Sequence, residues 1–302
     1  MLPRSDLGKT GLAVSRIGLG TVKLGRNQGV KYPQAFELPD DKEARALLTC
    51  ARDLGINLID TAPAYGYSEE RLGTLLRGER KEWVISTKAG EEFNFNKASG
   101  EGESRFDFSP DGLRLSVERS LRRMRTDYLD IVLIHSDGSD ADIIHRHQAL
   151  HTLAQLKREG WIRAFGMSTK TLEGGLLCAQ EADVVMTTYA ADVEDDQTLL
   201  DACSKNKTGV LLKKIFNSGH LLQAPEKALK ASEIDSENAE QPSTNFGPSQ
   251  RTEREIERQM KVIFGQPAVN SAIIGTLNCQ HLQTNAECAL VALADLPSSN
   301  FK

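Results

Sequence analysis

Short apolar runs alternate with longer segments of helical spacing along most of the chain. The apolar runs are mostly continuous, which is typical of strands that are covered on both faces. We predict eight such strands, at residues 16–19, 57–60, 83–87, 131–135, 164–168, 184–187, 210–213 and 272–275. Each strand is followed by a predicted helix, at residues 41–54, 68–76, 109–125, 143–159, 172–180, 196–206, 252–264 and 280–294.

Eight repeats of a strand followed by a helix favour an α/β protein with a parallel sheet. The 302 residues suit one closed (β/α)8 TIM barrel better than its competitor, an open doubly wound sheet. The stretch 18–23 begins like a dinucleotide fingerprint, but the third glycine is missing, so we reject a Rossmann domain. Residues 7–14 predict a short N-terminal β-hairpin, and residues 1–302 are predicted to form a single barrel domain.

Two segments interrupt this rhythm, and both follow predicted strands. Residues 23–40 form a long connection that carries Tyr32 and Phe36, and residues 231–250 are polar and poor in apolar side chains. Loops that follow the strands of a barrel lie on the face of its active site. Both segments are therefore candidate lids or substrate-selecting loops. The alternative is that they are surface insertions with no role in the site. We expect the segment at 231–250 to be mobile.

Composition and charge narrow the class of protein. The chain is 39% hydrophobic and 26% charged with a net charge of −5, so it has enough apolar residues for a core and no basic run for nucleic acid or an anionic membrane. The sequence has no run of eighteen apolar residues, so we expect no membrane-spanning helix. The five scattered cysteines argue against a disulfide framework and for a reducing compartment, so we expect a cytoplasmic protein.

Four polar residues lie at or just beyond the ends of the second, third and fourth predicted strands. They are Asp60, Tyr65, Lys88 and His135. The carboxyl ends of barrel strands meet in one bowl, so we expect these side chains to converge, with Asp60 and Lys88 as buried partners. An ammonium beside a phenol lowers the phenol's pKa, which would make Tyr65 a proton donor to a carbonyl oxygen as hydride reaches the carbon. No short-range His or Cys accompanies Asp60, so we predict no metal site.

The stretch Asp-Thr-Ala-Pro-Ala-Tyr-Gly-Tyr-Ser-Glu at 60–69 resembles the signature of the aldo-keto reductase superfamily, as do Ser-Thr-Lys at 86–88 and the strand-ending His135. The resemblance implies a (β/α)8 barrel that reduces small aldehydes and ketones with NAD(P)H. It implies Tyr65 as the general acid, Lys88 and Asp60 as the pair that tunes it, and His135 as the group that orients the substrate.

The same resemblance implies a nicotinamide site with three departures. Gly20 and Thr21 would approach the nicotinamide ribose beside Asp60, and Ser168 would bond the carboxamide. At three positions where the family commonly has Asn, Gln and an aromatic ring, this chain has Thr169, Met186 and Lys213. A lysine stem covers one face of a nicotinamide without stacking as a ring does.

The resemblance also implies an adenosine phosphate site after the eighth strand. Its residues are Gly275, Thr276, Leu277, Asn278, His281 and Asn285. Backbone amides at the start of a helix suit phosphate oxygens. We expect NADP(H) rather than NAD(H), although His281 stands where NADP-preferring relatives often have an arginine. A catalytically weak, cofactor-sensing or partner-binding barrel, as in the potassium-channel β subunits, is the alternative function, and Met186 and Lys213 are the residues that favour it.

Overall fold

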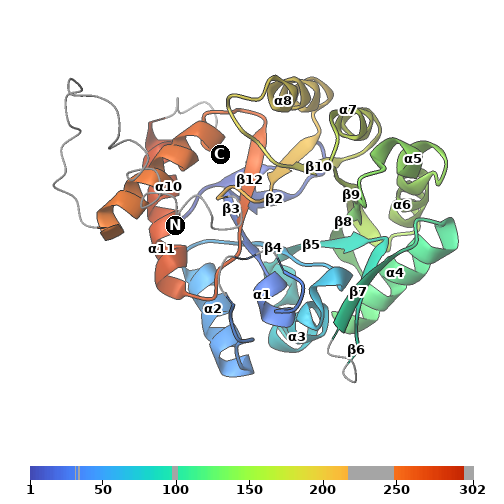
Figure 1. Ribbon diagram of the computed structural model, residues 1–302, viewed down its shortest axis with the longest axis horizontal. Helices are drawn as coiled ribbons and strands as arrows, with labels where there is room; N and C mark the ends of the chain where they lie inside the picture. Colours follow the sequence, from blue (N-terminus) through green and yellow to red (C-terminus); the bar gives the residue numbers. More distant parts are fainter. Residues whose placement is uncertain (31, 33–34, 97–100, 217–247, 296–302) are drawn as a thin grey trace, which may run out of the picture.

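Eight parallel strands close into a barrel in the computed structural model, which describes residues 1–30, 32, 35–96, 101–216 and 248–295 (Figure 1). Their order around the barrel is β10-β11-β12-β3-β4-β5-β8-β9. The strands are β3 (Ile17–Gly20), β4 (Leu58–Asp60), β5 (Val84–Ala89), β8 (Leu129–His135), β9 (Ile162–Ser168), β10 (Val184–Thr187), β11 (Gly209–Leu212) and β12 (Val269–Ile274). The predicted TIM barrel of eight strands is confirmed, and the strand bounds differ by a few residues.

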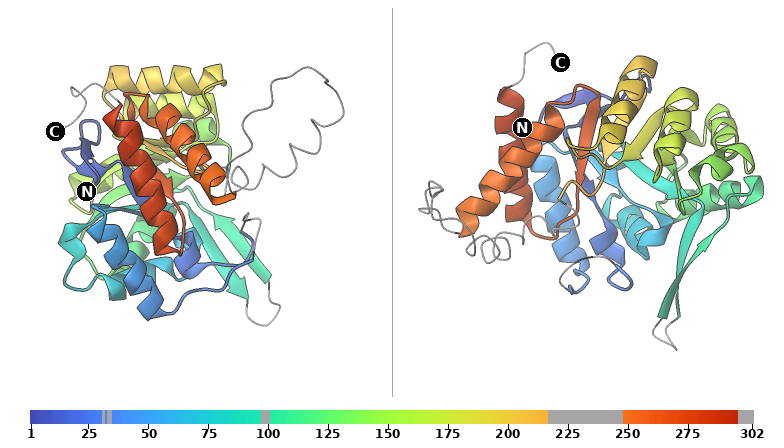
Figure 2. Two further views of the ribbon diagram at one scale, coloured as in Figure 1. Left: turned by 90° about the vertical axis from the view of Figure 1, so that its left-hand side faces the viewer. Right: turned by 45° about the horizontal axis from the view of Figure 1, so that its top comes forward.

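Helices surround the strands in all three views (Figures 1 and 2). They are α1 (Val22–Gly25), α2 (Asp41–Asp53), α3 (Ser68–Leu75), α4 (Pro110–Arg123), α5 (Asp140–His145), α6 (Ala149–Arg158), α7 (Leu172–Glu181), α8 (Glu194–Asn206), α10 (Pro248–Phe264) and α11 (Cys279–Ala294). Local signals fix several of their ends. Asp40 and Glu43 form a capping box at the start of α2, and Gly55 takes a positive φ of 88° just after it.

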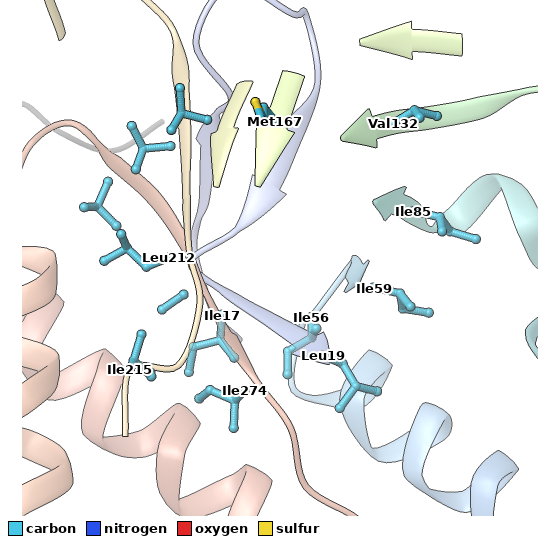
Figure 3. Packing of buried hydrophobic residues seen from close by; sticks show 14 of the residues in the cluster. Ile17, Leu19, Ile56, Ile59, Ile85, Val132, Met167, Leu212, Ile215 and Ile274 are labelled. Atoms are coloured by element: carbon cyan, nitrogen blue, oxygen red, sulfur yellow. The ribbon is translucent and has the colours of Figure 1, made fainter. Parts of the chain in front are cut away.

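Two apolar layers hold the barrel together. The outer layer lies between the strands and the helices, and Figure 3 shows Ile59, Ile85 and Val132 within it. The inner layer fills the barrel interior and includes Met186. Leu7 and Leu12, from the hairpin of β1 (Arg4–Asp6) and β2 (Ala13–Ser15), join the inner layer. The hairpin itself is predicted by the sequence. It lies against the residues at the start of β11, so it closes the N-terminal end of the barrel and leaves the other end for a site.

Three local features differ from the predicted elements. The helix predicted at 143–159 is two helices, α5 and α6, because Gln148 takes a left-handed conformation with φ 51° between them. An unpredicted antiparallel hairpin, β6 (Glu91–Asn96) with β7 (Glu101–Phe106), projects from the end of β5 (Figure 2). Of the predicted insertion at 231–250, residues 231–247 lie outside the described chain, and residues 248–250 begin α10 rather than a loop.

Candidate active site

The predicted tetrad gathers at the open, C-terminal end of the barrel. Asp60 and His135 are the last residues of β4 and β8, and Lys88 is the penultimate residue of β5. Tyr65 ends a 3-10 turn, Pro63–Tyr65, that begins three residues after β4. The rings of Tyr65 and His135 meet edge to face with centroids 6.3 Å apart. The parallel register therefore brings residues from three strands to one rim, as the sequence predicts.

Lys88 is enclosed by hydrogen-bond acceptors. Its ammonium donates to Asp60 Oδ1 and, at 3.0 Å, to the carbonyl oxygen of Thr61. Ser86 also donates to Asp60 Oδ1, at 2.9 Å. The side chains of Lys88 and Asp60 are 1% and 5% exposed. This is the partnership expected from the sequence, because two charges at this depth stay charged only when each satisfies the other.

Tyr65 differs from the prediction in its acidity. Burial raises the pKa of its phenol well above 10, and the negative charges of Asp60 and Glu91 raise it further. The guanidinium of Arg26 opposes this shift. The expectation that the pKa of Tyr65 lies below its ordinary value is therefore wrong for this structure. The physical reason is that burial dominates, the Lys88 ammonium is engaged by Asp60 and the Thr61 carbonyl, and the charge of Asp60 adds to the upward shift, so the phenol remains protonated at neutral pH.

Two residues that the sequence prediction did not include complete the tetrad's surroundings. Glu91 places Oε2 2.7 Å from Nδ1 of His135. Arg26 donates to the carbonyl oxygen of Ala64 at 2.9 Å, and its guanidinium lies 3.5 Å from the ring centroid of Phe93. The only sequence signal for Glu91 is an acidic residue three positions after Lys88. For Arg26, which lies in a long connection, no local signal exists.

Lys213 occupies the edge of the predicted nicotinamide pocket. Its ammonium donates to Ser168 Oγ at 2.7 Å and to the Thr169 carbonyl oxygen at 3.0 Å. Burial lowers the pKa of Lys213 to about 7, and the positive charge of Lys214 lowers it further. Met186 lies in the inner layer of the barrel and is 2% exposed. The structure thus brings Ser168, Thr169 and Lys213 together, whereas Met186 serves the barrel interior.

Thr21 holds the ends of two strands together beside Gly20. Its amide and its hydroxyl both donate to the Asp60 carbonyl oxygen at 2.9 Å, and its hydroxyl accepts from Ser68. The Thr21 side chain is fully buried. Only backbone at Gly20 and Thr21 therefore remains to approach a cofactor. Tyr32, from the segment at 23–40, lies over the neighbouring Gly275, where an added Cβ would sit 3.4 Å from its hydroxyl.

The start of α11 has the features of an adenosine phosphate site. Asn278 caps the helix by accepting from the amides of Gln280 and His281, and His281 is exposed in the first turn. Thr276 and Leu277 precede the cap. The Asn285 Oδ1 is buried with no hydrogen-bond partner in the described chain. An adenine amino group would supply the missing donor, so these residues fit a dinucleotide.

Comparison with known proteins agrees with this geometry. The sequence profile of the aldo/keto reductase family matches residues 16–296. The chain belongs to this family. It is 44% identical to a Pseudomonas aeruginosa protein of known crystal structure that is described as an aldo-keto reductase, over 96% of both chains with a TM-score of 0.76. It is 31% identical to D-threo-aldose 1-dehydrogenase from a Pseudomonas species, over 72% of this chain and 70% of that protein.

A third relative is the NADH-specific methylglyoxal reductase of Escherichia coli, which is 31% identical over 68% of this chain and 64% of that protein. This aldo-keto reductase is therefore an oxidoreductase that uses a nicotinamide cofactor, NAD(P)H, to reduce carbonyl groups.

Within the described ranges, no helix is long and apolar enough to cross a membrane. The same residues contain no group of three or more His, Cys, Asp or Glu side chains arranged to hold a metal ion.

One covalent link corrects the sequence analysis. Cys50 in α2 and Cys279, the first residue of α11, form a disulfide. Cys178, Cys203 and Cys288 are free and buried. The expectation that all five cysteines are reduced is therefore wrong for Cys50 and Cys279. A separation of 229 residues gave no spacing signal, because α2 and α11 become neighbours only when the barrel closes.

Proposed function

We propose that Tyr65 donates the proton in carbonyl reduction, that Lys88 and Asp60 fix its electrostatic surroundings, and that His135 orients the carbonyl oxygen. The observation that carries this assignment is the edge-to-face contact of Tyr65 with His135 at the end of the barrel where the buried Lys88–Asp60 pair also lies. A phenol with a raised pKa keeps its proton at neutral pH, so it is available as a donor.

A reduced nicotinamide held beside Ser168, Thr169 and Lys213 would supply a hydride, which is an electron pair and a proton, to the carbonyl carbon. The carbonyl oxygen then takes the Tyr65 proton, so the substrate becomes an alcohol and Tyr65 becomes a phenolate. Arg26 lowers the pKa of Tyr65, and its positive charge would stabilise that phenolate. A proton from water restores the phenol. Each turnover thus adds one hydride and one proton to the substrate.

We further propose that NADP(H) is preferred over NAD(H). Thr276, Asn278 and the exposed His281 offer one hydroxyl, one amide and one imidazole for a 2′-phosphate beside the helix N-terminus. The names of two relatives suggest small, hydroxylated or dicarbonyl substrates such as aldoses and methylglyoxal. The alternative of a cofactor-sensing barrel is not better supported by the comparisons. Closure of the barrel by β3 and β12, from opposite halves of the chain, supports one domain over residues 1–302. The three free cysteines are compatible with the cytoplasm as the proposed compartment, whereas the Cys50–Cys279 disulfide is unusual there.

The decisive experiment compares Tyr65→Phe with Tyr67→Phe. Tyr67 is 56% exposed and only two residues away, so it controls for loss of a hydroxyl near this turn. NADPH oxidation is measured with a panel of small aldehydes and ketones. We expect Tyr65→Phe to lower kcat at least about a hundredfold and Tyr67→Phe to leave it unchanged. The dissociation constant of NADPH should be the same in both variants. Turnover by Tyr65→Phe at the wild-type rate would disprove the assignment.

A further inference from the structure

The first residue of the β6–β7 hairpin, Glu91, lies at the rim of the candidate active site, next to His135. Gly90 takes a positive φ of 99° directly after β5, and an added Cβ there would lie 2.6 Å from the Phe108 ring. The chain therefore turns sharply at Gly90, and Glu91 becomes the first residue of β6. β6 packs against the 3-10 turn that carries Tyr65. The positive φ of Gly90, which glycine adopts readily, thus determines the position of Glu91.

Several contacts hold Glu91 in this position. Ser104 on the paired strand β7 is hydrogen-bonded to its carboxylate. Arg26 lies between the hairpin and the Tyr65 turn, because its guanidinium covers Phe93 and also donates to the Ala64 carbonyl oxygen. The Glu91 side chain is 13% exposed, and its Oε2 is 2.7 Å from His135 Nδ1. An exposed, mobile carboxylate would not keep one ring nitrogen engaged.

The contact of Glu91 with Nδ1 decides what the other ring nitrogen of His135 can do. A carboxylate only accepts hydrogen bonds, so the imidazole must carry its proton on Nδ1 to bond it. Neutral His135 then presents the Nε2 lone pair to the bowl. Protonated His135 presents Nε2–H instead. Without Glu91, a neutral imidazole is free to take the opposite tautomer and donate from Nε2.

We propose that Glu91 is a positioning residue for the reaction. Its carboxylate fixes the Nδ1–H tautomer of His135, so that neutral His135 accepts a hydrogen bond from a substrate hydroxyl and protonated His135 donates one to a substrate carbonyl. This inference rests on the proposed function of the tetrad. The step moves no net proton through His135, because Tyr65 and the substrate oxygen exchange the proton in both directions. The protonation state of the Glu91–His135 pair therefore selects between carbonyl reduction and alcohol oxidation.

The groups that face the pair set its titration. Burial lowers the pKa of His135 below 6.5, Glu91 raises it, and Lys88 and Lys213 lower it. Burial alone would raise the pKa of Glu91, but its hydrogen bond and charge interaction with His135, helped by Ser104 and Arg26, lower it overall. At neutral pH the pair is thus a carboxylate beside a neutral imidazole. The neutral form of His135 can then accept from a substrate hydroxyl, and the protonated form, which becomes more populated on acidification, orients a carbonyl oxygen as proposed above.

The first test measures the tautomer directly in the free enzyme. Imidazole 15N NMR distinguishes a protonated from an unprotonated ring nitrogen, and the spectrum of a His135→Asn variant identifies the His135 signals among the six histidines. We expect neutral His135 in the wild-type protein to carry its proton on Nδ1. A proton on Nε2 would overturn the proposal, and this measurement requires no substitution at Glu91.

The second test compares Glu91→Gln with Glu92→Gln and Glu91→Asp. Glu92 is the adjacent residue and contacts Arg123 on α4 at 3.0 Å, so its substitution removes a neighbouring carboxylate that does not touch His135. We expect the pKa of His135 to fall by about one unit or more in Glu91→Gln, because a carboxylate in contact is lost. Glu91→Asp should keep a value closer to wild type, and Glu92→Gln should keep the wild-type value. An unchanged pKa in Glu91→Gln would show that Glu91 only supports the hairpin.

Kinetics link this pair to the reaction. We expect kcat/KM for carbonyl reduction to fall, and kcat/KM for alcohol oxidation to rise, as pH increases through the same inflection. Both inflections should move to lower pH together in Glu91→Gln, with NADPH affinity unchanged. The proposal would be overturned if, in Glu91→Gln, the inflections of the two kcat/KM profiles moved in opposite directions or if only one of them moved. Failure of the proposed function would appear differently, as full turnover in Tyr65→Phe, and would leave the tautomer measurement intact.

Discussion

Lys88 donates to Asp60 across two neighbouring strands, β5 and β4, at a depth where neither side chain reaches solvent. Asp60 and the Thr61 carbonyl oxygen engage the Lys88 ammonium, and the charge of Asp60 raises the pKa of Tyr65. Burial dominates the acidity of Tyr65, and its pKa therefore moves upward instead of downward. The same pairing makes Lys88 and Asp60 important for stability, because each is the main partner of the other's buried charge.

Replacement of Lys88 by Met leaves Asp60 charged and without its main partner. We expect Lys88→Met to lower the free energy of unfolding by about 3–5 kcal/mol, because an uncompensated buried charge remains. The double variant Asp60→Leu/Lys88→Met should be more stable than the single variant. Urea unfolding at pH 7 measures both. A single variant as stable as the wild type would mean that water reaches this pair.

Lys213 makes stability depend on pH. The pKa of its ammonium is about 7 in the folded protein against 10.5 ordinarily, so the unfolded chain binds more protons between these values. Stability contributed by this group therefore rises with pH across that window, by at most about 1.4 kcal/mol per pH unit. Lys213→Met should reduce this slope in urea unfolding between pH 7.0 and 9.0, whereas Lys205→Met, at an exposed position of α8, should not. Equal slopes in all three proteins would contradict the lowered pKa.

His281 lies where a 2′-phosphate is expected. His281→Arg should tighten NADPH binding by about tenfold and leave NADH binding nearly unchanged, because a fixed positive charge gains a charge-assisted hydrogen bond to the phosphate alone. Fluorescence titration with both cofactors measures the effect. Gln283→Arg adds the same charge to another exposed position of α11 and serves as the control. Equal tightening of both cofactors by His281→Arg would remove this residue from the phosphate site.

The disulfide between Cys50 and Cys279 predicts the number of reactive thiols. Thiol titration in guanidinium should count three free thiols before reduction and five after it. Reduction should also lower Tm, since a link across 229 residues removes up to about 5 kcal/mol of chain entropy from the unfolded state. Cys50→Ser should count four thiols without reductant. Five thiols in the unreduced wild-type protein would show that the bond does not form.

The sequence by itself determined the barrel and the tetrad. Continuous apolar runs of strand length, each followed by an amphipathic segment, have one main solution, in which helices cover parallel strands. Asp60, Lys88 and His135 could be predicted because each closes an apolar strand, and parallel strands end at the same rim. The hairpin of β6 and β7 escaped this reasoning, although Phe93 and Phe95 alternate with polar residues over that segment.

Only the tertiary structure decided the surroundings of these residues. Glu91 contacts His135, Arg26 covers Phe93, and Cys50 meets Cys279 because separate segments converge after the barrel has closed. The pKa of Tyr65 depends on the same convergence, since burial and neighbouring charge are properties of three-dimensional position. Periodicity records which face of an element is buried. It holds no information on which distant side chain that face will meet, and that meeting sets the proton chemistry.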